Sequence, residues 1–202
     1  MNRERQAGLA AAIRTLLADR TQTLADDVSR VSYRSYLSGD VAVRERETVF
    51  RRCPQLGCPS ARLPSPGSYV LSSLNGRPVV IVRTAQGDVR AFLNLCRHRG
   101  APLVTSPAGS LSAFVCPYHH WSFRLTGELI SPVHAGCFSG LSEQERRLHG
   151  VPAAEKGGFI WLAEDEGAFS EAALPEETLG ELESFNFSAY HHYGGFSLQK
   201  GG

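Results

Sequence analysis

The sequence lacks a strong net charge and has no long run of basic or acidic side chains. Its 202 residues contain 21 Lys and Arg against 20 Asp and Glu, which gives a formal charge of +1. The adjacent pairs Arg51 with Arg52 and Arg146 with Arg147 are isolated, and solvated helix faces account for them better than a binding patch does. This composition gives no support for nucleic acid or an anionic membrane as the main partner.

A long apolar segment is also lacking. Residues 1–20 carry charges on both sides of a short apolar run, and Arg14 interrupts the run itself. A secretory signal needs an uninterrupted apolar region, and a membrane-spanning helix needs a longer one. We therefore expect a cytoplasmic protein that has no membrane partner.

The cysteines do not form the pattern of a disulfide framework. Their number is odd, and they stand at Cys53, Cys58, Cys96, Cys116 and Cys137. Metal ligation or free thiols are the better interpretations in a reducing compartment. Cys53 and Cys58 could form half of a zinc site, but no second pair occurs at that spacing, so we expect free thiols there.

Two helices are predicted before residue 60. Four apolar residues recur at helical spacing and share one face, which predicts a first helix that packs: Leu9, Ile13, Leu16 and Leu17. A second helix is expected from Asp40, as its N-cap, through residues 41–52. Residues 53–68 are dense in proline, glycine and serine and predict a loop.

From Tyr69 onward the sequence is rich in short apolar segments with β-branched residues. The turn signals Asn75-Gly76 and residues 86–88 separate three such segments, which predicts a β-meander with tight hairpins. Further strands are expected before Cys116, on both sides of Thr126-Gly127, and after a turn at Gly157-Gly158. The fold class is therefore mainly antiparallel β. We expect a helical lead at 1–60, a β domain at 61–167, and a tail at 168–202 with a helix and one more strand.

Two short segments, "LCRHRGAP" at 95–102 and "VCPYHHWSF" at 115–123, each contain a cysteine followed by a histidine. One residue separates the two in the first segment, and two residues separate them in the second. Two thiolates and two imidazoles bind either a structural zinc ion or a two-iron cluster, in which cysteines hold one iron and histidines hold the other. Zinc knuckles usually carry both cysteines of a pair on one turn. Here each loop supplies one sulfur and one nitrogen, so two metals can each be held by both loops, which favours the two-iron cluster.

These two segments resemble the cluster-binding boxes of Rieske proteins, specifically those of the Rieske domain in ring-hydroxylating (Rieske non-haem iron) oxygenase α subunits. The similarity extends over about residues 30–200. It implies a Rieske-type antiparallel β-sandwich with a cluster-binding subdomain of two loops, and a Rieske-type [2Fe-2S] cluster as the cofactor. It also implies that Cys96 and Cys116 bind the buried iron, while His98 and His119 bind the outer iron, which changes valence.

The resemblance further implies a low reduction potential. Respiratory Rieske proteins carry an additional cysteine in each box, which links the two loops by a disulfide, and this sequence has non-cysteines at those places, with Tyr118 inside the second box. They also carry two hydroxyl donors to sulfur where this chain has Trp121 and Phe123. Fewer hydrogen bonds to sulfur place the potential toward the low end of the range of roughly −150 to +300 mV.

His120 departs from the pattern, since the family usually has a small residue such as glycine there. A spare imidazole beside His119 could compete as a ligand. An exposed position at the rim of the site is the plainer interpretation.

A complete α subunit would also contain a C-terminal domain that holds a mononuclear ferrous ion through two histidines and a carboxylate. The sequence has no match to that motif, because its further histidines lack the spacing: His134, His149, His191 and His192. We therefore expect the N-terminal half of such a subunit, without catalytic residues of its own.

The expected function is oxidoreductase electron transfer, from a reductase or ferredoxin to a mononuclear iron site on another domain or subunit. The family's trimers imply a homo-oligomer. Two alternatives stay open: a stand-alone redox-sensing or ferredoxin-like protein without a catalytic partner, and a zinc-stabilised binding module.

Overall fold

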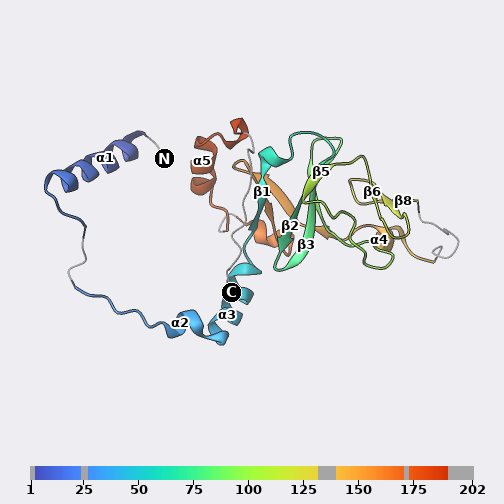
Figure 1. The fold of residues 1–202 in the computed structure, drawn as a ribbon, viewed down its shortest axis with the longest axis horizontal. Coiled ribbons are helices and arrows are strands. Elements are labelled where there is room, and N and C mark those ends of the chain that lie inside the picture. Colours follow the sequence, from blue (N-terminus) through green and yellow to red (C-terminus); the bar gives the residue numbers. More distant parts are fainter. Residues whose placement is uncertain (1–2, 24–26, 132–139, 171–172, 191–202) are drawn as a thin grey trace. The chain divides into compact units, whose positions relative to one another are not determined.

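The computed structural model describes residues 3–23, 27–131, 140–170 and 173–190. The chain divides into two units, of which the first ends at Glu45 and the second begins at Arg46. The first unit contains three helices (Figure 1): α1 (Arg3–Ala18), α2 (Arg34–Leu37) and α3 (Gly39–Glu45). Every strand that the structure describes belongs to the second unit.

The two helices predicted near the N-terminus are present, with corrections to each. None of the residues in α1 is buried, and Leu9 and Leu17 are 52% and 72% exposed. We predicted that this helix packs, but it packs on nothing in the described part of the unit that contains it, and that prediction is wrong. In α3 the backbone N–H of Ala42 donates to the carbonyl of Ser38 at 3.1 Å. Asp40 therefore lies in the first turn of the helix and is not its N-cap.

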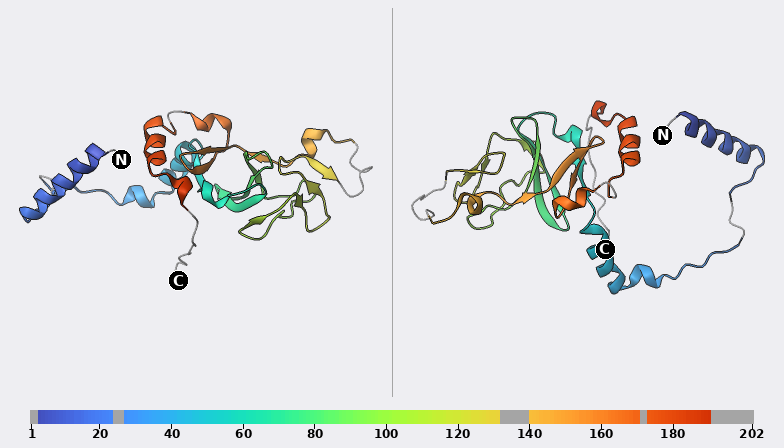
Figure 2. Two further views of the ribbon diagram at one scale, coloured as in Figure 1. Left: turned by 90° about the horizontal axis from the view of Figure 1, so that it is seen from above. Right: turned by 180° about the vertical axis from the view of Figure 1, so that it is seen from behind.

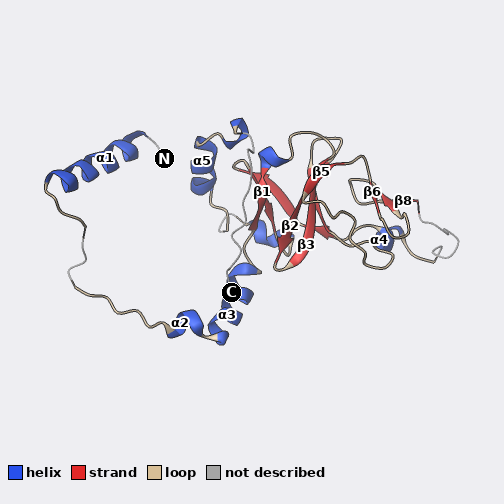
Figure 3. Cartoon of the chain, in the orientation of Figure 1, coloured by secondary structure: helices blue, strands red, loops and turns tan. Residues whose placement is uncertain are grey.

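The second unit is built on a five-stranded antiparallel sheet (Figure 3). Its strands follow the order β5 (Ala108–Ser110), β2 (Ser68–Leu74), β3 (Arg77–Arg83), β4 (Val89–Leu93) and β9 (Gly150–Val151). Asn75 and Gly76 connect β2 to β3 with φ values of 50° and 79°. A two-residue hairpin turn of this kind requires positive φ at both positions, which is why the Asn-Gly pair predicted it correctly.

Two three-stranded antiparallel sheets complete the unit. One has the order β1 (Gln55–Pro59), β11 (Phe159–Leu162) and β10 (Ala153–Lys156), and the other has the order β6 (Phe114–Val115), β7 (Ser122–Phe123) and β8 (Leu129–Ser131). Figures 1 and 2 place the β6–β8 sheet and α4 (Glu143–Arg146) at one end of the unit, with β2 and β3 between them and β1.

Strand β1 corrects the prediction that residues 53–68 form a loop. It is an edge strand that pairs with β11, with an irregular register between Leu56 and Cys58. Proline is tolerated at a strand end on a sheet edge, so Pro59 does not prevent the pairing. Its partner lies about a hundred residues downstream, too far for local sequence patterns to reveal the strand.

Strand β3 separates two hydrophobic cores. Val80 and Val82 point into a core shared with Cys96, Cys116 and the β6–β7 hairpin. The alternate residues Val79 and Ile81 point into a second core against β1 and β11. All four are fully buried. A strand covered on both faces needs a continuous apolar run, which residues 79–82 supply.

The remaining helical segments are short. Ser142 and Glu145 form a capping box at the start of α4, and α5 (Glu176–Ser184) confirms the helix predicted in the tail. The other segments are η1 (Arg46–Phe50), η2 (Ser60–Arg62), η4 (Glu166–Phe169) and η5 (Phe187–Ala189). The further strand expected in the tail lies mostly in residues 191–202, outside the described residues. No helix in the described part of the chain is long and apolar enough to cross a bilayer.

We predict that Gly57→Ala lowers the free energy of unfolding by about 1–3 kcal/mol, the usual range for overpacking a core. A Cβ at this position would stand 2.8 Å from Cδ1 of Ile81 and 3.1 Å from the carbonyl oxygen of Ile160. Urea unfolding followed by circular dichroism measures the effect. Gly180→Ala in α5 is the control, since its Cβ would meet open space. Equal unfolding midpoints for the two variants would show that β1 does not pack tightly on β3.

Candidate metal centre

The first candidate loop leaves β4 and closes on itself between Cys96 and Ala101. The backbone N–H of Cys96 donates to the carbonyl of Ala101 at 2.8 Å, and the N–H of Gly100 donates to the carbonyl of Cys96 at 2.9 Å. Gly100 has a φ of 71°, in the left-handed region that glycine adopts without a steric penalty. His98 stands at the tip of this turn.

The second loop, between β6 and β7, has the same closure. The N–H of Cys116 donates to the carbonyl of Trp121, and the N–H of His120 donates to the carbonyl of Cys116, both at 2.9 Å. His120 occupies the place that Gly100 has in the first loop, and its φ is 56°. The left-handed backbone explains why a glycine is usual here. The His120 side chain is exposed, as the rim interpretation predicts.

The base of the first loop is fixed by a buried amide that sequence reasoning missed. The Oδ1 atom of Asn94 accepts the N–H groups of Leu103 and Val104 at 3.0 and 3.1 Å, and its Nδ2 donates to the carbonyl of Val104 at 2.8 Å. Asn94 is 4% exposed, so these bonds satisfy a polar group inside the core. In the sequence, a lone asparagine at the end of an apolar strand was the signal that could have revealed this buried amide.

The two candidate sulfur ligands lie side by side in the core. Cys96 and Cys116 are 4% and 1% exposed. Burial raises the pKa of the Cys96 thiol, and its hydrogen bond with Cys116 raises that pKa further. The backbone amides of His98 and Arg99 lower the same pKa by donating to the sulfur. Amides that favour a thiolate are suited to a cysteine that binds metal, because the thiolate is the ligand form.

The two candidate nitrogen ligands are also neighbours. The ring centroids of His98 and His119 are 4.7 Å apart, at an interplanar angle of 63°. The Nδ1 atoms of both rings are buried, and that of His119 has no hydrogen-bond partner among the described residues. Burial lowers the pKa of His98, and the nearby His119 and Arg99 lower it further. The neutral imidazole that this favours is the form that binds metal.

The four side chains are therefore sorted into a pair of thiols and a pair of imidazoles. Within the described ranges, no three side chains of His, Cys, Asp or Glu gather as the ligands of one ion would. Two sulfurs for one iron and two ring nitrogens for the other are the donors of a two-iron cluster of the Rieske kind. A buried ring nitrogen without a partner costs free energy unless a ligand satisfies it. The residues present thus fit the cluster.

Two arginines of the first loop, Arg97 and Arg99, interact with neighbouring residues. Arg97 donates to the carbonyl of Glu145 in α4 at 3.1 and 2.6 Å and contacts the ring of His149. Burial lowers the pKa of His149, and the charge of Arg97 lowers it further. Arg99 is exposed, and its charge acts on His98.

The remaining cysteines and histidines lie away from these pairs or outside the described residues. Cys58 is buried in the core on the other face of β3, and burial raises its pKa to about 11. Cys53 is half-buried and free. The others fall outside the described ranges: His134, Cys137, His191 and His192.

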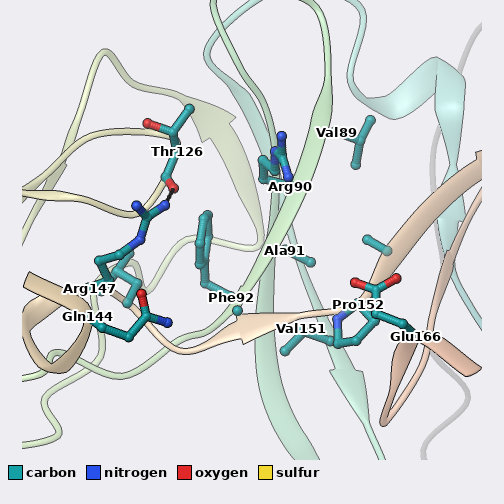
Figure 4. A pocket seen from close by; sticks show the side chains of 13 residues that line it. Val89, Arg90, Ala91, Phe92, Thr126, Gln144, Arg147, Val151, Pro152 and Glu166 are labelled. Carbon is teal, nitrogen blue, oxygen red and sulfur yellow. Dashed lines mark hydrogen bonds between the residues drawn. The ribbon is translucent and has the colours of Figure 1, made fainter.

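A hollow of about 330 Å³ lies apart from these pairs, between β4, the turn at Thr126 and the segment 144–153 (Figure 4). Its lining contains no cysteine or histidine in the described part of the chain. Arg147 points across it to donate to the carbonyl of Thr126 at 3.2 Å and forms an ion pair with Glu128 at 2.7 Å. These contacts occupy the arginine structurally, at the junction between the β7–β8 hairpin and the five-stranded sheet.

Comparison with known proteins identifies the domain that carries these loops. Residues 53–143 match the Rieske [2Fe-2S] domain. The chain is 36% identical over 158 residues to the large oxygenase component of the naphthalene 1,2-dioxygenase system of Pseudomonas aeruginosa, covering 77% of this chain and 34% of that protein. It is 36% identical over 149 residues to benzene 1,2-dioxygenase subunit alpha of Pseudomonas putida, covering 73% and 33%.

A solved structure shares the fold. A quaternary ammonium Rieske monooxygenase in complex with L-carnitine superposes with a TM-score of 0.67 at 29% identity, covering 76% of this chain and 43% of that one. The chain spans about a third of the length of the curated relatives it matches. Residues 53–143 thus form a Rieske domain, which binds a Rieske-type [2Fe-2S] cluster, and the chain is similar to the N-terminal part of ring-hydroxylating dioxygenase large (α) subunits.

Proposed function

We propose that this chain carries one electron from a reductase or ferredoxin to a mononuclear iron site, as the N-terminal part of an aromatic-ring-hydroxylating oxygenase α-like subunit. The observation that carries the proposal is the sorting of the site into buried thiols and paired imidazoles, with a buried Nδ1 on His119 that lacks a partner among the described residues. The electron-carrying domain is proposed to span residues 61–167, after the helical lead and before the tail.

Four residues are proposed to hold the cluster, which when bound takes up and releases one electron. Cys96 and Cys116 would hold the inner iron, because their sulfurs lie in the core and are shielded from water. His98 and His119 would hold the outer iron, because their rings are only half-buried and stand at the loop tips. This arrangement excludes water on the sulfur side and leaves the imidazole edge accessible to a partner.

The exposed rim suggests how a partner docks. Arg97 and Arg99 are the charged side chains of residues 95–102, and residues 115–123 contain none. Tyr118 is 59% exposed beside them. Two loops whose own charged side chains are both positive favour an acidic partner surface and steer it by long-range attraction.

The substrate is not proposed beyond its class. The relatives' names refer to naphthalene and benzene, and that of the solved structure refers to L-carnitine. The aromatic class rests on the dioxygenase relatives, which have the higher identity. A cytoplasmic location and a homo-oligomeric assembly remain parts of the proposal.

Iron analysis and spectroscopy test the proposal directly. Protein purified without oxygen should contain two irons and two acid-labile sulfides per chain, as a [2Fe-2S] domain requires. Its reduced form should give an EPR signal with an average g value below that of all-cysteine clusters, and it should accept one electron in a redox titration. Protein that contains zinc and no sulfide would contradict the proposal and would support the alternative of a zinc-stabilised binding module. A cluster that is reduced by no ferredoxin or reductase would favour the redox-sensing alternative.

We predict that Cys96→Ser, His98→Ala, Cys116→Ser and His119→Ala each abolish the EPR signal, because each removes one donor from a set of four. Iron content and the EPR spectrum of the reduced protein measure the effect. Cys53→Ser and Cys58→Ala are the matched controls and should keep the signal, since Cys58 lies in the other core. Loss of the cluster in either control would mean that the ligand assignment is wrong.

We predict that Arg99→Glu slows reduction by an acidic ferredoxin about tenfold at low ionic strength, because a rim charge acts mainly on the rate of encounter. Stopped-flow absorbance at several salt concentrations measures the rate, and the difference from the unmodified protein should shrink as salt screens the charges. Arg90→Glu, an exposed residue of β4 outside both loops, makes the same change in net charge. An equal effect of the two variants would refute docking at the loop tips.

A further inference from the structure

An aromatic contact joins the two loops. The imidazole of His98, from the first loop, stacks on the indole of Trp121, from the second, with ring centroids 5.0 Å apart and an interplanar angle of 6°. Cysteines that could link the loops by a disulfide are absent from both segments, since each contains one cysteine alone. The stack is therefore a non-covalent contact between two loops that no disulfide joins.

Trp121 is the fixed member of this pair. Its side chain is 2% exposed and belongs to the core beneath the loops, where its ring lies 6.4 Å from that of Phe123. Its backbone carbonyl accepts the N–H of Cys116 at 2.9 Å, so closure of the second loop also sets its position. His98 is half-buried at the tip of the first loop. The indole thus provides a rigid plane against which the imidazole is held.

The stack continues toward the surface. His98 contacts His119 at 4.7 Å between centroids, and His119 contacts Tyr118 at 3.8 Å. Tyr118 is 59% exposed, so the four rings run from the core to the rim of the site. The contact between Trp121 and His98 holds a proposed ligand of one loop against a core residue of the other.

We propose that Trp121 is a positioning residue, which locks the ring plane of His98 and holds the two loops together. The proposal rests on the proposed function, in which His98 is a cluster ligand. Without the indole, His98 could rotate about its side-chain bonds, and its Nδ1 atom would lose the buried orientation that it has here. The cluster would then be held less firmly on its histidine side, while the cysteine side would stay intact.

The experiment compares Trp121→Leu, which removes the ring, with Trp121→Phe, which keeps a smaller one. Phe92→Leu is the matched control, because Phe92 is 5% exposed in the same core but its ring contacts Phe114. The rate of iron loss to a chelator, followed by visible absorbance, should rise about threefold to tenfold in Trp121→Leu, as expected for the loss of one aromatic stack. It should rise less in Trp121→Phe and stay within about twofold in Phe92→Leu.

Two further readouts separate positioning from a general loss of stability. In the reduced protein, the nitrogen hyperfine coupling of one histidine should change in Trp121→Leu and stay unchanged in Phe92→Leu. In cluster-free protein, the NMR signals of the His98 ring should be shifted upfield by the indole and lose that shift in Trp121→Leu, with a smaller loss in the better-tolerated Trp121→Phe.

Equal rates of iron loss for Trp121→Leu and Phe92→Leu, with unchanged histidine coupling, would overturn the proposal. The NMR measurement needs no cluster, so an unmodified protein that binds no iron would reject the proposed function and leave the stack to be judged by its ring shifts. If the His98 ring signals of the unmodified protein show no upfield shift, the stack of His98 on Trp121 is refuted.

Discussion

The proposed centre depends on holding two thiols and two imidazoles together across a gap between two loops that no disulfide joins. Burial supplies the constraint on the sulfur side, because Cys96 and Cys116 lie in a core covered by one face of β3. At the base of the first loop, Asn94 satisfies its amide inside that core and fixes the chain on both sides of the turn. The second loop is held by the pairing of β6 with β7 and by its own closing hydrogen bonds.

Much of this arrangement could be predicted from sequence where the signals are local. The Asn75-Gly76 turn, the apolar run of β3 and the spacing of cysteine and histidine each need only a few neighbouring residues. Strand β1 could not be predicted, because its pairing depends on β11 about a hundred residues away. The packing of Asn94 against residues 103–104 and of Trp121 against His98 is likewise non-local. The apolar face of α1 predicted a helix correctly, but periodicity alone could not show that this face stays exposed within its unit.

The centre has different electrostatic environments on its two sides. Burial raises the pKa of the Cys96 thiol, and backbone amides of the first loop counteract this. On the histidine side, burial and the charge of Arg99 favour neutral imidazole. Phe123, which is fully buried, offers no hydroxyl to the sulfurs, which accords with the low potential expected from the sequence. Arg99 is exposed, so the charge that lowers the pKa of the histidine is also available to the docking partner that we propose.

The left-handed backbone at His120 also affects how the loop tip can be labelled. A side chain other than glycine costs about 1 kcal/mol in this conformation, and asparagine, aspartate and histidine tolerate it better than most. A cysteine introduced there to carry a fluorophore or spin label would bear that strain and weaken the turn. Tyr118, two residues earlier, is exposed and has an ordinary negative φ. A probe attached there would carry no backbone strain, but it would replace the ring that contacts His119.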